Sequence, residues 1–105
     1  MAETPTPMEL LVASAKGWLR IATNSRDDEI RQVCEACLID LKNGGVAKRN
    51  YSEDSAIQQA IKLYLKSQFG YDQEAEKFDK AYEHLKAALA LSGDYNVEDP
   101  DGETG

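Results

Sequence analysis

Few residues of this chain could do chemistry, and the first candidate is the motif Cys34-Glu-Ala-Cys37. Two cysteines at this spacing form redox pairs or supply half of a zinc site. A redox pair takes its low pKa from a helix N-terminus, whereas these cysteines lie in the third turn of a predicted helix, in line with Ile30 and Leu41. A zinc site needs two more ligands, and the chain has no other cysteine and one histidine, His84. We interpret both cysteines as small buried core residues.

The other candidates for chemistry also have simpler structural interpretations. His84 falls opposite Phe78 on its predicted helix, beside Lys80, so we expect a solvated surface residue and not half of a nucleophile pair. The acids at 27–29 occupy a predicted first helical turn, where carboxylates favour the positive end of the helix dipole. The glycine-rich run at 43–46 follows a helix, whereas a phosphate loop follows a strand. The sequence therefore predicts no enzyme, no cofactor and no metal site.

The stretch from Ser52 to Asp72 is the part around which the chain should pack. Its apolar residues fall at the spacing of one helix face: Ile57, Ala60, Ile61, Tyr64 and Leu65. Ala56, Leu63 and Phe69 widen this face to an arc of roughly 240°. A helix so broadly apolar needs neighbours on several sides, so it should be the central helix of the domain. We expect Ser52 to cap its start and Gly70 to end it.

Two more helices are predicted before this central one. The first should begin at Thr6-Pro7-Met8-Glu9, which reads as a capping box with proline at the first helical position, and end by Thr23-Asn24. Gly17, inside it, suggests close approach by another backbone. The second should be capped by Ser25 and end at Asn43-Gly44-Gly45. The buried stripes are Met8, Leu11, Ala15, Trp18 and Leu19, then Ile30, Val33, Cys34, Cys37, Leu38 and Leu41.

A fourth helix should follow the central one. Asp72 can cap it, and Ser92-Gly93 can end it. Its buried stripe is Ala75, Phe78, Ala81, Tyr82, Leu85 and Leu89. No segment alternates as a strand would, so the fold class is all-α: a small four-helix domain with a broad-faced central third helix.

Charge and length set the boundaries of this domain. We expect a flexible N-terminus over residues 1–6, the four-helix domain over 7–93, and a disordered acidic tail over 94–105. The tail has five acids and no base, so most of the net charge of −7 lies there and the body is nearly neutral. The connection at 46–51 carries Lys48 and Arg49 without a nearby acid. No apolar run is long enough to span a bilayer, and the N-terminus lacks a signal-peptide layout.

Some apolar residues point away from the predicted core. Ile39 projects about 180° from Ile30, among polar residues, and Ala87 and Leu91 lie similarly far from Phe78 on the fourth helix. Single exposed hydrophobic residues are ordinary, but two such spots on a domain without a catalytic constellation favour an assembly protein. We therefore predict a subunit interface at Ile39, Ala87 and Leu91. Lys48 and Arg49 are candidates to pair with the acidic tail of a neighbouring subunit.

The order of several segments resembles the phage head-tail connector family, whose members are also labelled phage DNA packaging proteins. The segments are Leu10-Leu11, Ala15 to Ile21, Asp27 to Ile30, Cys37 to Leu41, Ala60 to Tyr64, Phe69-Gly70-Tyr71 and, within 78–96, Phe78, Ala81-Tyr82, Leu85-Lys86, Leu89 and Ser92 to Asn96. The resemblance implies a four-helix adaptor, dodecameric in the assembled particle, that docks beneath the portal protein of a tailed phage or prophage. There it would extend the DNA channel and offer the surface on which the next connector, head-completion or tail protein assembles.

That resemblance also implies where the protein acts. We expect it in the host bacterial cytoplasm during assembly and then at the head-tail junction of the virion, with no membrane association. DNA would pass through the channel without sequence-specific binding, which suits a body that lacks a basic stripe.

Two other classes of function stay open at this point. One is a DNA-binding packaging factor, similar to a small terminase or a helix-turn-helix protein, that would use Lys42, Lys48 and Arg49; the acidic charge balance counts against it. The other is a monomeric helical regulator that binds a host protein. Size measurement separates a ring from a monomer, and salt-dependent retention on DNA identifies a DNA binder.

Overall fold

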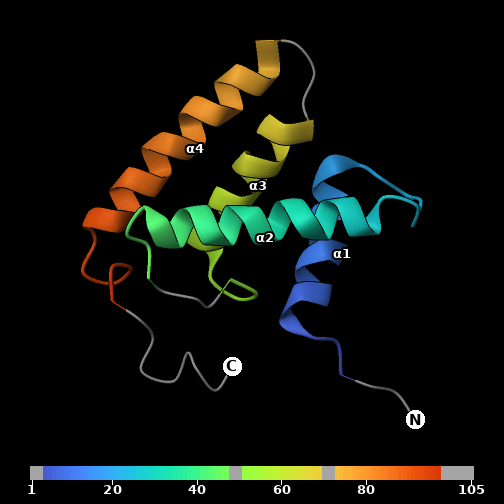
Figure 1. Cartoon of the computed structure of the whole chain (residues 1–105), viewed down its shortest axis with the longest axis horizontal. Coiled ribbons are helices and arrows are strands. Elements are labelled where there is room, and N and C mark those ends of the chain that lie inside the picture. Colours follow the sequence, from blue (N-terminus) through green and yellow to red (C-terminus); the bar gives the residue numbers. More distant parts are fainter. Residues whose placement is uncertain (1–3, 48–50, 70–72, 98–105) are drawn as a thin grey trace.

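The chain folds into four α-helices, and the computed structural model describes residues 4–47, 51–69 and 73–97 (Figure 1). The helices are α1 (Pro7–Leu19), α2 (Asp27–Asn43), α3 (Ser55–Phe69) and α4 (Gln73–Leu91). The described ranges contain no strand, so the all-α four-helix prediction is confirmed. Within those ranges, no helix combines the length and apolar character needed to cross a membrane.

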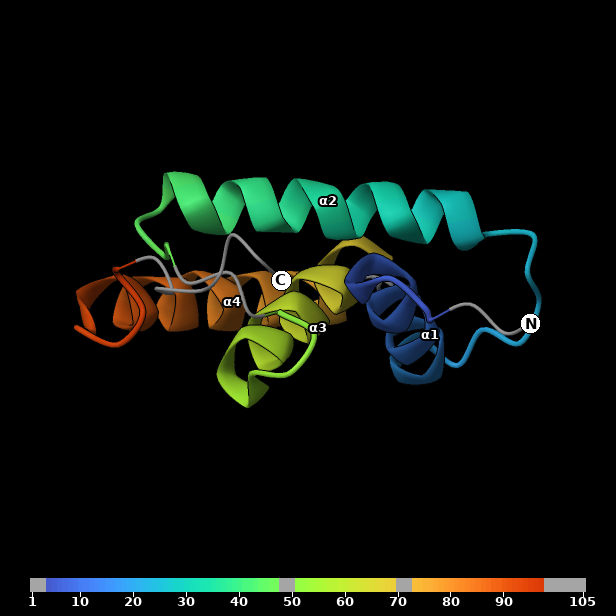
Figure 2. The ribbon, with the colours of Figure 1, turned by 90° about the horizontal axis from the view of Figure 1, so that it is seen from below.

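The third helix is central, as its broad apolar face predicted. α3 packs against each of the other three helices, and Ile57, Ala60, Ile61 and Leu65 on it are buried. Figure 2 shows α2 as a layer of its own, lying across the other helices. The molecule measures 46 × 38 × 18 Å. Since a helix with its side chains is roughly 10 Å across, the short dimension corresponds to two helix layers.

The first helix begins as the sequence predicts. The Glu9 amide donates to Thr6 Oγ1 at 3.1 Å, and the Thr6 amide donates to Glu9 Oε1 at 2.8 Å, which completes the capping box. The helix ends at Leu19, earlier than the Thr23-Asn24 limit, because Arg20 adopts a left-handed conformation with φ 59°. Its amide and that of Ile21 then bond the last turn's carbonyls.

The start of α3 corrects the predicted cap. Asp54, and not Ser52, caps the helix: its Oδ1 accepts hydrogen bonds from the amides of Ala56 and Ile57 at 2.9 and 3.0 Å. The same carboxylate accepts a bond from the Tyr95 hydroxyl at 3.0 Å. Asp54 therefore joins the first turn of α3 to the segment that follows α4, which periodicity along the chain cannot reveal.

The cap predicted for the second helix is also wrong. α2 begins at Asp27, and the capping position is Arg26, which makes no side-chain capping bond. The Ser25 hydroxyl instead accepts a bond from Thr23 Oγ1 at 2.8 Å within the preceding turn. No side chain caps this helix, but Asp27, Asp28 and Glu29 in its first turn interact favourably with the positive end of the helix dipole.

Two packing expectations fail for a common reason. Apart from its own helix, nothing among the described residues lies within 4 Å of a Cβ built on Gly17, so no described backbone from elsewhere approaches it closely. Ala81, predicted in the buried stripe of α4, is exposed. Both residues lie on helix faces that no other helix of the chain covers, and a helical wheel does not show how many neighbours a helix has.

The predicted domain limits are partly covered by the structure. Tyr95 lies inside the range expected to be a disordered tail, yet it is half-buried and its carbonyl accepts a bond from the Ala47 amide at 2.8 Å. Packing therefore continues past Gly93. Residues 1–3 and 98–105 lie outside the described residues. So do Lys48 and Arg49, the predicted stop at Gly70 and the predicted cap at Asp72.

We expect Ile61→Ala to lower the free energy of unfolding by roughly 2 to 5 kcal/mol, because it removes a fully buried aliphatic side chain from the central helix. Denaturant melts followed by circular dichroism measure the loss. The matched control is Ile39→Ala on the outer side of α2, where a change within about 0.5 kcal/mol is expected. A loss below about 1 kcal/mol at Ile61 would mean that α3 is not the centre of the core.

Candidate assembly surfaces

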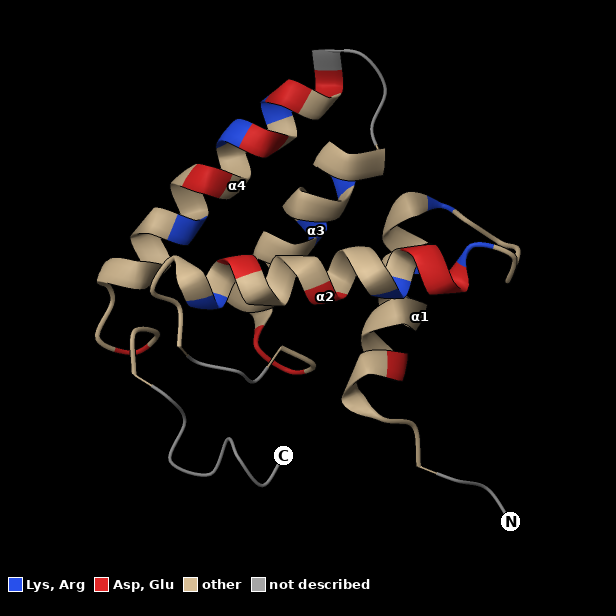
Figure 3. Ribbon diagram, in the orientation of Figure 1, with Lys and Arg blue, Asp and Glu red and all other residues tan. Residues whose placement is uncertain are grey.

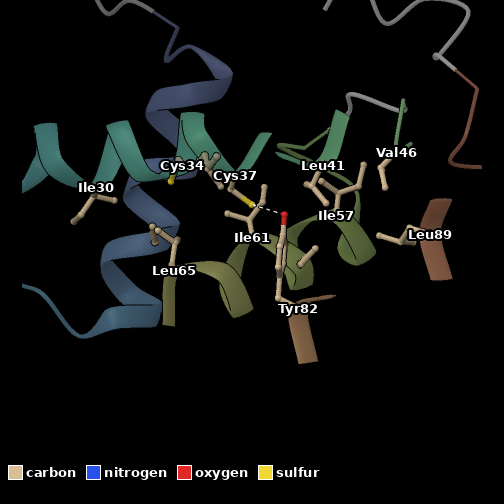
Figure 4. Close-up of a cluster of buried hydrophobic side chains, with 13 residues drawn as sticks. Ile30, Cys34, Cys37, Leu41, Val46, Ile57, Ile61, Leu65, Tyr82 and Leu89 are labelled. Atoms are coloured by element: carbon tan, nitrogen blue, oxygen red, sulfur yellow. Dashed lines mark hydrogen bonds between the residues drawn. The ribbon is translucent and has the colours of Figure 1, made fainter. Parts of the chain in front are cut away.

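The two cysteines are core residues, as predicted. Both side chains are fully buried, and Cys37 Sγ donates to the Tyr82 hydroxyl at 3.9 Å (Figure 4). Burial raises the pKa of each thiol to about 12. Since the thiolate is the species that binds metals and attacks disulfides, neither cysteine is poised for such chemistry.

Beside the cysteines lies a polar contact that joins α2 to α4. Tyr82 is fully buried, and its hydroxyl donates to Asp40 Oδ2 at 2.6 Å. Lys86 donates to the same oxygen at 2.8 Å and also pairs with Glu83 at 3.0 Å. Burial by itself would raise the pKa of Asp40, but the hydrogen bonds from Lys86 and Tyr82 outweigh it and hold the pKa below its ordinary value. The contact thus fixes a charged carboxylate at the helix junction.

The other polar residues form no reaction centre in the part of the chain that is described. His84 is exposed on α4, as predicted. No cluster of three or more histidine, cysteine or acidic side chains among the described residues could hold a metal ion. Figure 3 shows acidic residues at the start of α2 and both charges along α4.

The residues predicted for the subunit interface are accessible. Ile39 is 61% exposed on α2, and Leu91 is 85% exposed at the end of α4. Ala87 is exposed as well, and Ala88 beside it extends the same surface. The structure does not bring Ile39 and Leu91 together, because they project from different helices away from the core.

Two more exposed hydrophobic residues were not singled out in the sequence. Leu10 on α1 is 48% exposed and Val97 after α4 is 61% exposed. Leu10 falls about 100° from buried Leu11 on the helical wheel. This offset from the buried stripe could have predicted that Leu10 is exposed. Val97 is the one aliphatic residue of the range 94–105, where no periodicity exists to place it.

A groove of about 660 Å³ lies between α1 and the start of α2. Its apolar floor includes Met8 and Val12, and its rim carries Glu9, Lys16, Asp27, Asp28 and Arg31. Lys16 and Asp27 already pair across it at 3.0 Å. The rim has charges of both signs and no convergent set of polar groups, so its chemistry selects no ligand class.

We expect native Cys34 and Cys37 to react with a thiol reagent at least about 100-fold more slowly than in the unfolded chain, because a raised pKa leaves little thiolate at neutral pH. Absorbance of the released reagent group, with and without denaturant, measures both rates. A metal chelator should leave the melting temperature unchanged. Fast labelling of the native protein, or a melt that depends on the chelator, would contradict the assignment of both residues to the core.

We expect Asp40→Asn to lower the free energy of unfolding at neutral pH by about 1 kcal/mol, a modest loss because the carboxylate is partly exposed. A carboxylate with a depressed native pKa stabilises the fold above its unfolded pKa and loses that effect as the pH falls through its native pKa. The difference between variant and wild type should therefore shrink below about pH 4. Denaturant melts across the pH range test this, with exposed Asp94→Asn as the control; a difference independent of pH would assign the effect to packing.

Comparison with known proteins identifies a family. No curated protein and no solved structure matches the chain. A family model described as "Phage connector protein" matches residues 11–96, which covers all of α2, α3 and α4, most of α1 and the turn that carries Tyr95. A match over most of the chain shows the family. This chain belongs to the phage connector protein family.

Proposed function

We propose that the protein is a head-tail connector that forms a ring beneath the portal protein of a tailed phage or prophage. There it extends the channel through which DNA leaves the head. It also presents the surface on which the next head-completion or tail protein docks. Family membership supports a structural role in the phage particle, and the observation that carries the ring is a thin domain with exposed hydrophobic residues on two separate helices.

The exposed residues suit repeated contacts between identical subunits. A ring needs a heterologous contact, in which two different patches of the same chain meet. Ile39 lies on α2 and Leu91 on α4, so each can be buried by a neighbouring copy without competing for the same position. Burial of apolar residues at the centre of such a contact supplies association energy, while the surrounding charges set the register and the rate of encounter.

The proposed life cycle has two stages. The protein is made in the host bacterial cytoplasm, where it assembles as a dodecamer on the portal, and it then stays in the virion. DNA passes through the ring without sequence-specific contacts, which fits a chain with 19 acidic and 12 basic residues. Pairing of Lys48 and Arg49 with the acidic tail of the next subunit is part of this proposal and would be masked by added salt.

We expect Ile39→Asp to abolish assembly on the portal while the monomer stays folded. The substitution places a carboxylate at the centre of the contact and costs about 2 kcal/mol or more of binding free energy at each junction. Light scattering of the protein, alone and mixed with purified portal, gives the mass of the complex, and circular dichroism checks the fold.

The matched control is Ala22→Asp, which adds the same charge at an exposed position in the turn between α1 and α2. It should assemble as the wild type does. If Ile39→Asp assembles normally, or if it unfolds the monomer, Ile39 is not in the contact. If the wild type itself never exceeds the mass of a monomer, even with portal, the ring is wrong. Retention on DNA that falls steeply with salt would instead favour a DNA-binding packaging factor.

A further inference from the structure

Two exposed strips with matching patterns lie on different helices. The α2 strip consists of Asp28, Gln32, Glu35 and Ile39, which lie opposite the buried stripe of α2 and are all exposed. It carries two acids, Asp28 at its start and Glu35 one turn before its end, and it ends in Ile39, which is 61% exposed. Since α2 forms a layer of its own, no helix of the same chain covers this side (Figure 2).

The α4 strip has the opposite charge in its first half. It consists of Lys77, Lys80, His84, Ala87, Ala88 and Leu91, which lie opposite buried Tyr82 and are all exposed. Its first half is basic, and its second half is apolar up to Leu91 at the helix end. α4 runs along the edge of the molecule in Figure 1, and the exposure of all six residues places the strip on an uncovered side of this helix.

The spacing along the two strips is the same. Asp28 and Ile39 are 11 residues apart on α2, and Lys80 and Leu91 are 11 residues apart on α4. Eleven residues make three helical turns and span about 16 Å, so each pair stays on one face of its helix. If two helices lie parallel, Ile39 meets Leu91 and Asp28 meets Lys80. If they lie antiparallel, Ile39 meets Lys80 and Leu91 meets Asp28, so each hydrophobic side chain faces a charged one.

We propose that the α2 strip of one copy packs lengthwise and parallel on the α4 strip of the next copy, with Ile39 against Leu91. The proposal rests on the ring described above and specifies its junction. A crossing angle near 20° keeps two helices in contact over three turns. Because the two strips differ, each copy keeps one strip free for the next neighbour, and the contact repeats until it closes.

Existing surface ion pairs do not oppose this contact. Arg31 pairs with Asp28 at 3.5 Å and with Glu35 at 3.4 Å, and Lys80 pairs with Glu76 at 3.7 Å. These pairs are long, and each involves exposed side chains, so they contribute little and can exchange partners at small cost. A symmetric contact between two α2 strips would instead bring acidic residues together, which disfavours it.

The test is disulfide crosslinking of the double variant Ile39→Cys/Leu91→Cys under mild oxidation, with the complex formed on the portal. The native cysteines are buried with raised pKa values, so they stay out of the reaction. We expect a reducible ladder of covalent oligomers beyond the dimer on non-reducing gels. A mixture of the two single variants should give dimers and nothing larger.

Two controls fix the polarity and the symmetry of the junction. Asp28→Cys/Leu91→Cys should give no ladder, because these residues meet only if the helices are antiparallel. Ile39→Cys alone should give no dimer, because a dimer would mean that two α2 strips meet. A product in either control overturns the proposal.

The experiment also separates this junction from the ring itself. If the double variant reaches the mass of the ring under reducing conditions but gives no ladder on oxidation, the ring uses other faces and this junction is wrong. If neither wild type nor variant assembles, the ring and the junction both fail. Circular dichroism of each variant confirms that these exposed substitutions leave the fold intact.

Discussion

The burial of α3 is the constraint on which the rest of this structure depends. Its buried residues Ile57, Ala60, Ile61 and Leu65 contact helices that come from both ends of the sequence. Each of the other helices buries one stripe against this common surface and leaves its opposite side uncovered. A domain built around one shared helix therefore becomes broad and thin, and its exposed helix faces are a consequence of the packing.

Two polar contacts then fix how the outer parts meet this core. The buried hydroxyl of Tyr82 reaches Asp40 on α2, and the hydroxyl of Tyr95 reaches Asp54 at the start of α3. In each contact a tyrosine ring lies against the core while its hydroxyl satisfies a carboxylate at the margin. The described residues include no buried charged side chain. Asp40 and Asp54 therefore contact these tyrosine hydroxyls at the edge of the core. These contacts join α4 to α2 and the segment after α4 to the start of α3.

Most of the fold could be predicted from the sequence because helical periodicity records burial directly. The stripe of α2 and the central position of α3 follow from spacing alone. The errors are of another kind. Ser25 and Ser52 have side chains that can cap, but α2 and α3 begin later in the chain. Asp54 caps α3 and also contacts Tyr95, a contact that local sequence does not show. Ala81 lies beside Tyr82 and was assigned to the core, yet α4 has too few neighbours to cover it.

The candidate surface was predictable in part for the same reason. Ile39 and Leu91 are conspicuous because each lies opposite a buried stripe, so the sequence alone marks them as exposed. The contact proposed between them is not encoded in the periodicity of one helix. That contact depends on the charged and apolar residues around Ile39 on α2 and around Leu91 on α4. The two sets can be compared only once both helices are placed in space. Once they are placed, Asp28 lies as far from Ile39 as Lys80 does from Leu91, and the two strips match in charge and in apolar end.

The separation between core and surface has a consequence for how such a protein can change. The residues that hold the fold lie toward α3, while the exposed residues of α2 and α4 lie on the opposite sides of the same helices. Substitutions on the outer strips therefore leave the buried stripes intact, and additivity is expected for residues that share no partner. In the role proposed above, the protein contacts a portal on one side and a tail component on the other. If the residues that stabilise the fold differ from those that contact partners, the contact residues can change without loss of the structure.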